Sequence, residues 1–409
     1  MLVDYLFYHD SLAAFVHRRG KPAVRVHLGK SAPIEDAVRE WRPLLVSGRS
    51  DLSFGAAVKK LVYAPLEKHL EGAKVVLVSP DGVLGLVPFA ALPGKKEGTY
   101  LIEDVALAVV SVPSAIPGLM KPVKEDERQP SSLLVVGGVD YDGGKAVPQI
   151  ADARGAPLGI PRAWGALPGT AAEADAIARS FAATFKGETV KLSGGKATSG
   201  AVRAGLGKVR YAYLATHGFF APETVKSAAD RDGKERLGED RTPVGWHPLL
   251  LSGLAFAGAN REPKPGEEDG ILTALEISEL DLTRLELAVL SACETGLGNV
   301  NKGEGLLGMQ RAFAAAGARS VVASLWSVDD TATKQLMADF YSLAWDTKNV
   351  VSRAEALRKA QLAMLFGKTL DGKPRGVGKA PEKLPMGGDK RGRTLPYYWA
   401  AFVLSGDWR

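Results

Sequence analysis

In the first third of the chain, apolar residues alternate with polar ones over short distances, as is typical of strands with one buried face. Residues 5–28 hold several such runs, with Arg19-Gly20 at a turn, and predict a β-meander. Residues 32–46 carry apolar side chains at helical spacing, and residues 74–80 (KVVLVSP) form a short apolar run that ends at a turn. This region is therefore expected to combine short strands with at least one helix.

The remainder of the chain has a different pattern, in which continuous apolar runs alternate with amphipathic segments. The runs at 132–138 (SLLVVGG), 209–218 (VRYAYLATHG) and 285–293 (LELAVLSAC) are typical of strands buried on both faces of a parallel sheet. The segments between them predict helices, one of which has the capping-box spacing Thr170–Glu173 at its start. This alternation predicts an α/β fold with a mostly parallel sheet flanked by helices on both faces.

The change of pattern also predicts two domains, an N-terminal α/β subdomain at 1–125 and a second domain at 126–409. Three connections in the second domain are long and charged or rich in Gly and Pro, at 220–248, 257–269 and 366–393. Connections of this length are usually functional or disordered, so these three are candidate lids. The connection at 220–248 also holds four candidate self-cleavage sites: Arg231, Lys234, Arg236 and Arg241. The alternative is that these four residues are simply exposed charges.

The net charge of +6 is concentrated in one of these connections. Residues 366–393 contain eight Lys or Arg against three Asp or Glu, a local excess of +5, and the rest of the chain is close to balanced. Aromatic residues do not interleave with these cations as a stacking platform for nucleic acid requires. The excess therefore indicates a solvated loop, and we expect no nucleic-acid partner.

The composition also limits where the protein is expected to work. The chain has one cysteine and no run of 18 or more apolar residues, and its start lacks the basic-then-apolar layout of a secretion signal. A single cysteine forms no internal disulfide, which suits a reducing compartment. We therefore expect a cytoplasmic protein that does not span a membrane.

Two residues with reactive side chains follow apolar runs that predict neighbouring strands. His217 comes after 211–216 and Cys293 after 285–292. If these strands are adjacent, the imidazole faces the thiol at the edge of the sheet, where ligands of open α/β sheets bind. An imidazole makes the thiolate easier to form and can later protonate a leaving amine. The residues alone leave two interpretations open: a catalytic pair, or a buried thiol with a structural histidine.

The sequence around these residues resembles the CHAT family, caspase-like cysteine peptidases that are often joined to tetratricopeptide repeats. The pairing of HG with SACETG is the specific part of the resemblance. The segments that carry it are YLATHG (213–218), DGILTALEI (269–277), LAVLSACETGLG (287–298), GEGLLGMQRAFAAAGARSVVASLWSVDD (303–330), YYWAAFVLSGDW (397–408) and, in the first third, SPDGVLGLVPFAALPG (79–94).

The resemblance implies a cysteine endopeptidase that cleaves a protein substrate through a thioester intermediate. His217 would be the general acid and base, Cys293 the nucleophile, and the backbone N–H groups of Gly218 and Cys293 the oxyanion hole. No metal or other cofactor is implied. By analogy with separases, which belong to the same clan, the N-terminal subdomain would be an inactive pseudo-protease. The resemblance also implies a tetratricopeptide-repeat region, either on a longer parent protein or on a separate partner. It further implies a role in bacterial signalling or defence.

A pocket for the residue before the scissile bond is the least specified part of the site. Asp269 and Asp330 are candidates for pairing with an Arg or Lys of the substrate, and Glu294, next to the nucleophile, is a second-tier candidate. The alternative is structural, because Asp330 is an excellent helix N-cap and Asp269 a good turn residue.

Two other functions are compatible with parts of the sequence. The first is a non-catalytic caspase-like scaffold that binds a partner without cleaving it. The second is a nucleotide-binding module at GLGNVNKGEG (296–305), which is rich in glycine but lacks the Lys-Ser/Thr ending of a phosphate-binding loop.

Overall fold

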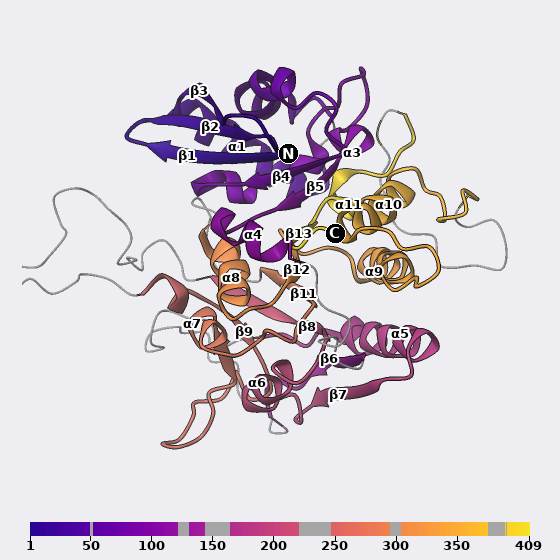
Figure 1. Cartoon of the computed structure of the whole chain (residues 1–409). Coiled ribbons are helices and arrows are strands. Elements are labelled where there is room, and N and C mark those ends of the chain that lie inside the picture. Colours follow the sequence, from indigo (N-terminus) through magenta and orange to yellow (C-terminus); the bar gives the residue numbers. More distant parts are fainter. Residues whose placement is uncertain are drawn as a thin grey trace, which may run out of the picture. The chain divides into compact units, whose positions relative to one another are not determined.

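The computed structural model describes residues 1–49, 52–121, 131–143, 164–220, 247–294, 304–374, 389 and 391–409. Contacts divide the chain into two compact units, one made of Met1–Pro122 with Ser324–Arg409 and the other of Val123–Ala323. Most helices and strands of both units are labelled in Figure 1. The predicted boundary near residue 125 stays a prediction, and the last 86 residues pack in the first unit.

The first unit is built on a sheet whose inner pairs are parallel. The strands lie in the order β13-β5-β4-β1-β2-β3, and β1, β2 and β3 form the predicted antiparallel meander. The pairs β1–β4, β4–β5 and β13–β5 are parallel. The bounds are β1 Leu2–Tyr8, β2 Ser11–His17, β3 Val24–Lys30, β4 Val75–Ser79, β5 Ala106–Val109 and β13 Phe402–Gly406.

The predicted helix at 32–46 is confirmed as α1, Ser31–Val46. It buries Ile34, Val38, Trp41 and Leu45, which recur every three or four residues and so form one apolar face. The other helices of this unit are α2 Ala56–Val58, α3 Leu101–Asp104, α4 Ile116–Leu119, α9 Asp330–Ala344, α10 Arg353–Leu365 and α11 Pro396–Trp399, with a π-helix at Lys59–Tyr63.

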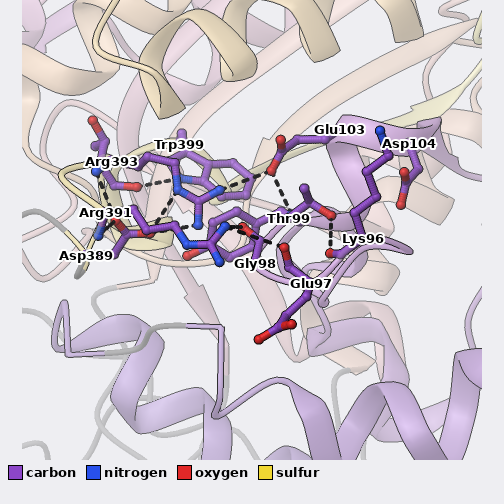
Figure 2. Close-up of polar contacts among 12 residues, drawn as sticks. Lys96, Glu97, Gly98, Thr99, Glu103, Asp104, Asp389, Arg391, Arg393 and Trp399 are labelled. Atoms are coloured by element: carbon purple, nitrogen blue, oxygen red, sulfur yellow. Dashed lines mark hydrogen bonds and ion pairs between the residues drawn. The ribbon is translucent and has the colours of Figure 1, made fainter.

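A group of charged residues ties the chain near its C-terminus to the segment at 97–104 (Figure 2). The guanidinium of Arg393 donates to Asp389 through Nε and Nη2, at 3.0 and 2.8 Å, and to Glu103 at 3.3 Å. It also lies 4.9 Å from the ring centre of Tyr100. Burial alone would raise the pKa of Asp389, but hydrogen bonds from the backbone and side chain of Arg393 and from the backbone of Arg391 hold it below its usual value. The two carboxylates and the cation therefore form one compensated, largely buried group.

The second unit has a mostly parallel sheet, which confirms the fold class predicted from the sequence. β8 is central: it pairs in parallel with β6 and β11, which pair in parallel with β7 and β12 respectively. An antiparallel pair, β9 and β10, continues from the last residues of β8. The bounds are β6 Ser132–Val139, β7 Glu188–Gly194, β8 Tyr211–Phe220, β9 Ser252–Ala255, β10 Ile271–Thr273, β11 Leu287–Glu294 and β12 Ser320–Ser324.

Helices cover both faces of this sheet, as the continuous apolar runs predict. On one face Tyr213 of β8 donates a hydrogen bond to Glu173 of α5. On the other, Leu134, whose register partner is Ala212, lies against Gly205 of α6. Nine of the ten residues of β8 are buried as a result. The helices are α5 Pro168–Thr184, α6 Ser199–Leu206, α7 Ala274–Ser278 and α8 Glu304–Ala315.

The predicted capping box at the start of α5 is wrong. The helix begins at Pro168, so Thr170 lies inside its first turn and not at its N-cap. The Thr170 hydroxyl donates to the carbonyl of Leu167 and accepts from the N–H of Gly138, while Glu173 accepts from Tyr213. Both side chains therefore attach α5 to the sheet. In the part of the chain that the structure describes, no helix has the length and apolar character needed to cross a bilayer.

Candidate functional site

The register of β8 and β11 places His217 beside Cys293. The Cα partners of this parallel pair run from Tyr211 with Leu287 to Gly218 with Glu294, and His217 pairs with Cys293. The expectation that the two strands are neighbours is therefore confirmed. The structure does not describe the side chains of Cys293 and Glu294 or the residues 295–303. These residues include all but the last two of the glycine-rich segment considered for nucleotides. The catalytic roles stay predictions.

Both strands are longer than the sequence suggested. His217 and Cys293 were expected to follow the strand ends, but β8 continues to Phe220 and β11 to Glu294. The cause at β8 is β9, which pairs antiparallel with its last four residues, from His217 with Ala255 to Phe220 with Ser252. The backbone of His217 is thus held by a strand on each side, which keeps the residue in one position.

The imidazole of His217 bonds to a backbone carbonyl from a distant segment. Its Nε2 lies 2.7 Å from the oxygen of Gly165, three residues before α5 begins. A carbonyl oxygen only accepts hydrogen bonds, so Nε2 must carry the proton. The neutral ring then has its lone pair on Nδ1, which is the nitrogen that can act as a base.

Two aromatic side chains pack on the same imidazole. The ring centre of Tyr141 lies 4.9 Å and that of Trp164 5.4 Å from the ring centre of His217, whose exposed fraction is 5%. Burial lowers the pKa of His217 below its ordinary value of 6.5, and the hydrogen bond to the Gly165 carbonyl offsets part of this effect. The imidazole is therefore neutral at physiological pH, the state in which it can accept a proton.

This shift gives a testable expectation for the Cys293→Ala protein, in which no thiol couples to the titration. The His217 ring should titrate with a midpoint below 6.5 when its ¹³Cε1 resonance is followed by NMR. Because the unfolded chain then binds the proton more tightly than the folded one, the free energy of unfolding should fall as the pH drops below 6.5. A midpoint at or above 6.5 would contradict the enclosed environment.

Tyr141 is held as a neutral phenol beside the histidine. The Thr216 hydroxyl donates to the carbonyl of Ala255, so the phenol must donate to Thr216 Oγ1, at 3.0 Å. Burial raises the pKa of Tyr141 to about 12, against the opposing effect of its hydrogen bonds with the Thr216 side chain and the His217 backbone. Tyr141 thus supplies a fixed, uncharged wall and does not compete for the proton on His217.

The other predicted oxyanion residue, Gly218, lies inside the strand ladder. Its register partners are Leu254 in β9 and Glu294 in β11. A Cβ at this position would come within 3.3 Å of the carbonyl oxygen of Ala292, so the two strands approach closely here. Glycine suits this close contact, and the role of its N–H in binding an oxyanion stays a prediction.

Comparison with known proteins assigns the chain to a family. The model of the CHAT domain matches residues 53–407. The chain belongs to the CHAT-domain family. Tetratricopeptide repeat protein 28 of Homo sapiens is 26% identical to this CHAT chain over 326 residues, which are 76% of the chain. The chain spans only 12% of that relative's length, and the same holds for the Mus musculus protein of the same name, at 28% identity.

Solved structures show a weaker similarity to this CHAT domain. The Saccharomyces cerevisiae separase–securin complex has a TM-score of 0.41 at 11% identity, covering 81% of this chain and 15% of that one. Gingipain R, the Arg specific cysteine proteinase RgpB of Porphyromonas gingivalis, has a TM-score of 0.43 at 9% identity, covering 92% and 74%. Since both TM-scores are low, membership of the family rests on the sequence match.

The structure shows what the two acidic pocket candidates do locally. Asp269 is a turn residue, as expected, and its Oδ1 accepts from the N–H of Ile271 at 2.9 Å. The expectation that Asp330 caps a helix is wrong: Asp329 is the N-cap of α9, accepting from Thr331 and Ala332, and Asp330 is the first helical residue. Asp330 belongs to the first unit and Asp269 to the second. Their part in a substrate pocket stays a prediction.

The candidate lids and self-cleavage sites are only partly covered by the structure. The segment 257–269 is described, whereas 221–246, with all four cationic candidates, and most of 375–390 lie outside the described residues. Among the residues that are described, no three His, Cys, Asp or Glu side chains gather closely enough to hold a metal ion.

Three residues that surround His217 were not predicted from the sequence: Tyr141, Trp164 and Gly165. A tryptophan in the Gly/Pro-rich segment PRAWGALPG (161–169) is a usable signal, because such a large apolar side chain is rarely left in a solvated connection. Gly165 gives no signal, since it acts through its carbonyl and lies 52 residues from its partner.

Proposed function

We propose that this CHAT domain is a cysteine endopeptidase with His217 and Cys293 as its dyad. The observation that supports the proposal best is the combination of register and tautomer. The residue that carries the only thiol is the Cα partner of a histidine whose Nε2 is occupied by Gly165, which leaves Nδ1 as the base. A positioned base beside a thiol is what nucleophilic catalysis by cysteine requires.

In this proposal the reaction proceeds in two steps. The imidazole takes the thiol proton, and the Cys293 sulfur attacks the carbonyl carbon of the scissile peptide bond. The C–N bond breaks as the imidazolium returns the proton to the leaving amine, which gives a thioester and the first product. Water, deprotonated by His217, then hydrolyses the thioester to a carboxylic acid and restores the thiol. The backbone N–H groups of Gly218 and Cys293 would stabilise the oxyanion in both steps.

The setting of this activity is also proposed. The substrate would be a protein of a bacterial signalling or defence pathway in the cytoplasm, and the N-terminal subdomain at 1–125 a pseudo-protease. A tetratricopeptide-repeat region would regulate access to the site, which agrees with the name of the curated relative.

Peptide cleavage tests the proposal directly. Wild-type protein and Cys293→Ala are incubated with a peptide library derived from a bacterial proteome, and new termini are identified by mass spectrometry. Wild type should generate cuts that the variant does not, and because Cys293 is the only cysteine, the variant carries no thiol that could act instead. Equal cutting by both proteins, or no cutting by either, would contradict the proposed peptidase activity.

A non-catalytic partner-binding module is the second candidate. The observation that favours it is the enclosure of His217, which is 5% exposed and has aromatic neighbours in Tyr141 and Trp164. A histidine packed in this way is also what a structural role produces. This candidate is preferred if wild type cuts no peptide.

A further inference from the structure

Both aromatic residues that pack on His217 are tied to one turn. Tyr141 follows β6 and Trp164 precedes α5, so they come from separate segments. The turn at 256–261 follows β9 and contacts both. A single residue of this turn, Asn260, makes the hydrogen bonds to the two of them.

Asn260 holds Tyr141 through its backbone and Trp164 through its side chain. Its N–H donates to the carbonyl of Tyr141 at 3.0 Å. Its Oδ1 accepts from the N–H of Trp164 at 2.7 Å, and its Nδ2 donates to the carbonyl of Trp164 at 3.0 Å and to Asp142 Oδ1 at 2.7 Å. These partners fix the orientation of the amide, because the flipped form would set NH₂ against an N–H and oxygen against two acceptors.

The turn that carries Asn260 is itself fixed. Gly258 has φ +83° and donates to the carbonyl of Asp140 at 3.1 Å. The N–H of Ala259 donates to Phe256 and that of Arg261 to Gly258, at 3.1 and 2.9 Å. Asn260 therefore projects from a rigid support that is bonded to the segment after β6.

The residue that most needs this support is Gly165. It is exposed, and glycine has more backbone freedom than any other residue, so its carbonyl would not keep one direction unaided. The peptide unit before it is clamped, because the carbonyl of Trp164 accepts from Asn260. That clamp and the start of α5 at Pro168 restrict the few residues between them.

We propose that Asn260 is a positioning residue for the dyad. By clamping the backbone of Trp164, it aims the Gly165 carbonyl at His217 Nε2 and so keeps the base on Nδ1. The effect of Asn260 on catalysis rests on the proposed function. The hydrogen bonds that position the Gly165 carbonyl exist without substrate and can be tested separately. The connection at 257–269 was expected to be a lid. In this proposal Asn260, near the start of that connection, positions the dyad instead.

Asn260→Ala tests the inference, since it removes the three carboxamide hydrogen bonds and keeps the backbone bond to Tyr141. Misplacing a catalytic group by about 1 Å costs up to about 100-fold in rate. We therefore expect kcat to fall about 10- to 100-fold with KM changed less than about twofold. Long-range ¹H–¹⁵N NMR of the His217 ring should show loss of the single Nε2–H tautomer. Asn349→Ala is the matched control, because Asn349 also donates to an aspartate, Asp346, but in a turn of the first unit.

A pair of variants separates positioning from general packing. Asn260→Asp keeps the acceptor for Trp164 but turns a carboxylate toward Asp142, and it should impair kcat as Asn260→Ala does. Adding Asp142→Asn restores a donor–acceptor contact between the two side chains, but residue 260 still has no N–H for the Trp164 carbonyl, so kcat should stay low in the pair. Full recovery of kcat in the pair would overturn the clamp on Trp164, because repulsion from Asp142 would then account for the loss in Asn260→Asp.

The outcomes for the two proposals differ. If wild type cuts no peptide but Asn260→Ala changes the His217 tautomer, the peptidase fails and the positioning role stands. If Asn260→Ala folds with unchanged kcat and an unchanged tautomer, the positioning role is overturned. Should Asn260→Ala fail to fold, the aspartate pair gives the same readouts. Loss of fold in all the Asn260 variants would also overturn it, because Asn260 would then determine folding.

Discussion

His217→Gln is expected to lower kcat/KM for peptide cleavage by about 100- to 10,000-fold, the range that a positioned general acid and base contributes. Glutamine is a demanding replacement because its amide NH₂ can still donate to the Gly165 carbonyl and fill part of the space beside Trp164. It has no nitrogen that accepts a proton at neutral pH. The expected loss therefore reports the base itself, and steady-state kinetics with a cleaved peptide from the library measures it.

The matched control for this variant is His247→Gln. His247 is exposed, and its Nδ1 accepts from the N–H of Leu249 at 3.3 Å at the start of a short 3₁₀ helix, Pro248–Leu250. Its replacement should leave kcat/KM within about twofold of wild type. If His217→Gln keeps more than a tenth of the activity while its thermal unfolding matches wild type, His217 is not the base.

Arg393→Met should have the largest expected effect on stability. The side chain of Arg393 is 11% exposed and that of its partner Asp389 5%, so the change removes a cation from a largely buried carboxylate. Breaking such a pair from one side costs about 3–5 kcal/mol, because the remaining charge is left without compensation. We expect the lower end, about 3 kcal/mol, since the backbone N–H groups of residues 391 and 393 still donate to Asp389. Urea unfolding of the first unit measures this loss.

Arg391→Met is the control beside it (Figure 2). Arg391 is exposed and donates to backbone carbonyls, among them that of Gly98 at 3.1 Å, so no charge is stranded when it is replaced. A hydrogen bond of this kind contributes about 1 kcal/mol. Equal losses in the two variants would mean that the buried carboxylate is not the source of the effect.

The sequence predicts well those elements that are determined by the side chains within one short stretch of the chain. The apolar runs of β6, β8 and β11 predicted buried parallel strands, because only strands covered on both faces tolerate such runs. The N-caps were predicted less well. Asp329 and Asp330 are adjacent and chemically identical. Which of them caps α9 depends on the path of the backbone between Trp326 and the helix, and no local sequence pattern specifies that path.

For the candidate site, the sequence supplied the reactive residues and the structure supplied their support. His217 and Cys293 stand out because each ends an apolar run, and the register of β8 with β11 places them as partners. The extension of β8 beyond Thr216 required β9, which is more than 30 residues away in the chain. Tyr141 packs on the histidine, and Asn260 bonds to the backbone of Trp164, only through tertiary contacts, so the residues next to them in the chain carry no sign of these roles.

The contact between His217 and Gly165 has a consequence for how this site would be found by mutagenesis. A Cβ at residue 165 would meet no atom within 4 Å, so many side chains fit there while the carbonyl stays in place. Substitution scanning would pass over this position, and a table of amino-acid frequencies would record it as variable. What the site depends on is the number of residues between Trp164 and α5. A deletion of one residue there would rotate the carbonyl away and leave every catalytic side chain in the sequence intact.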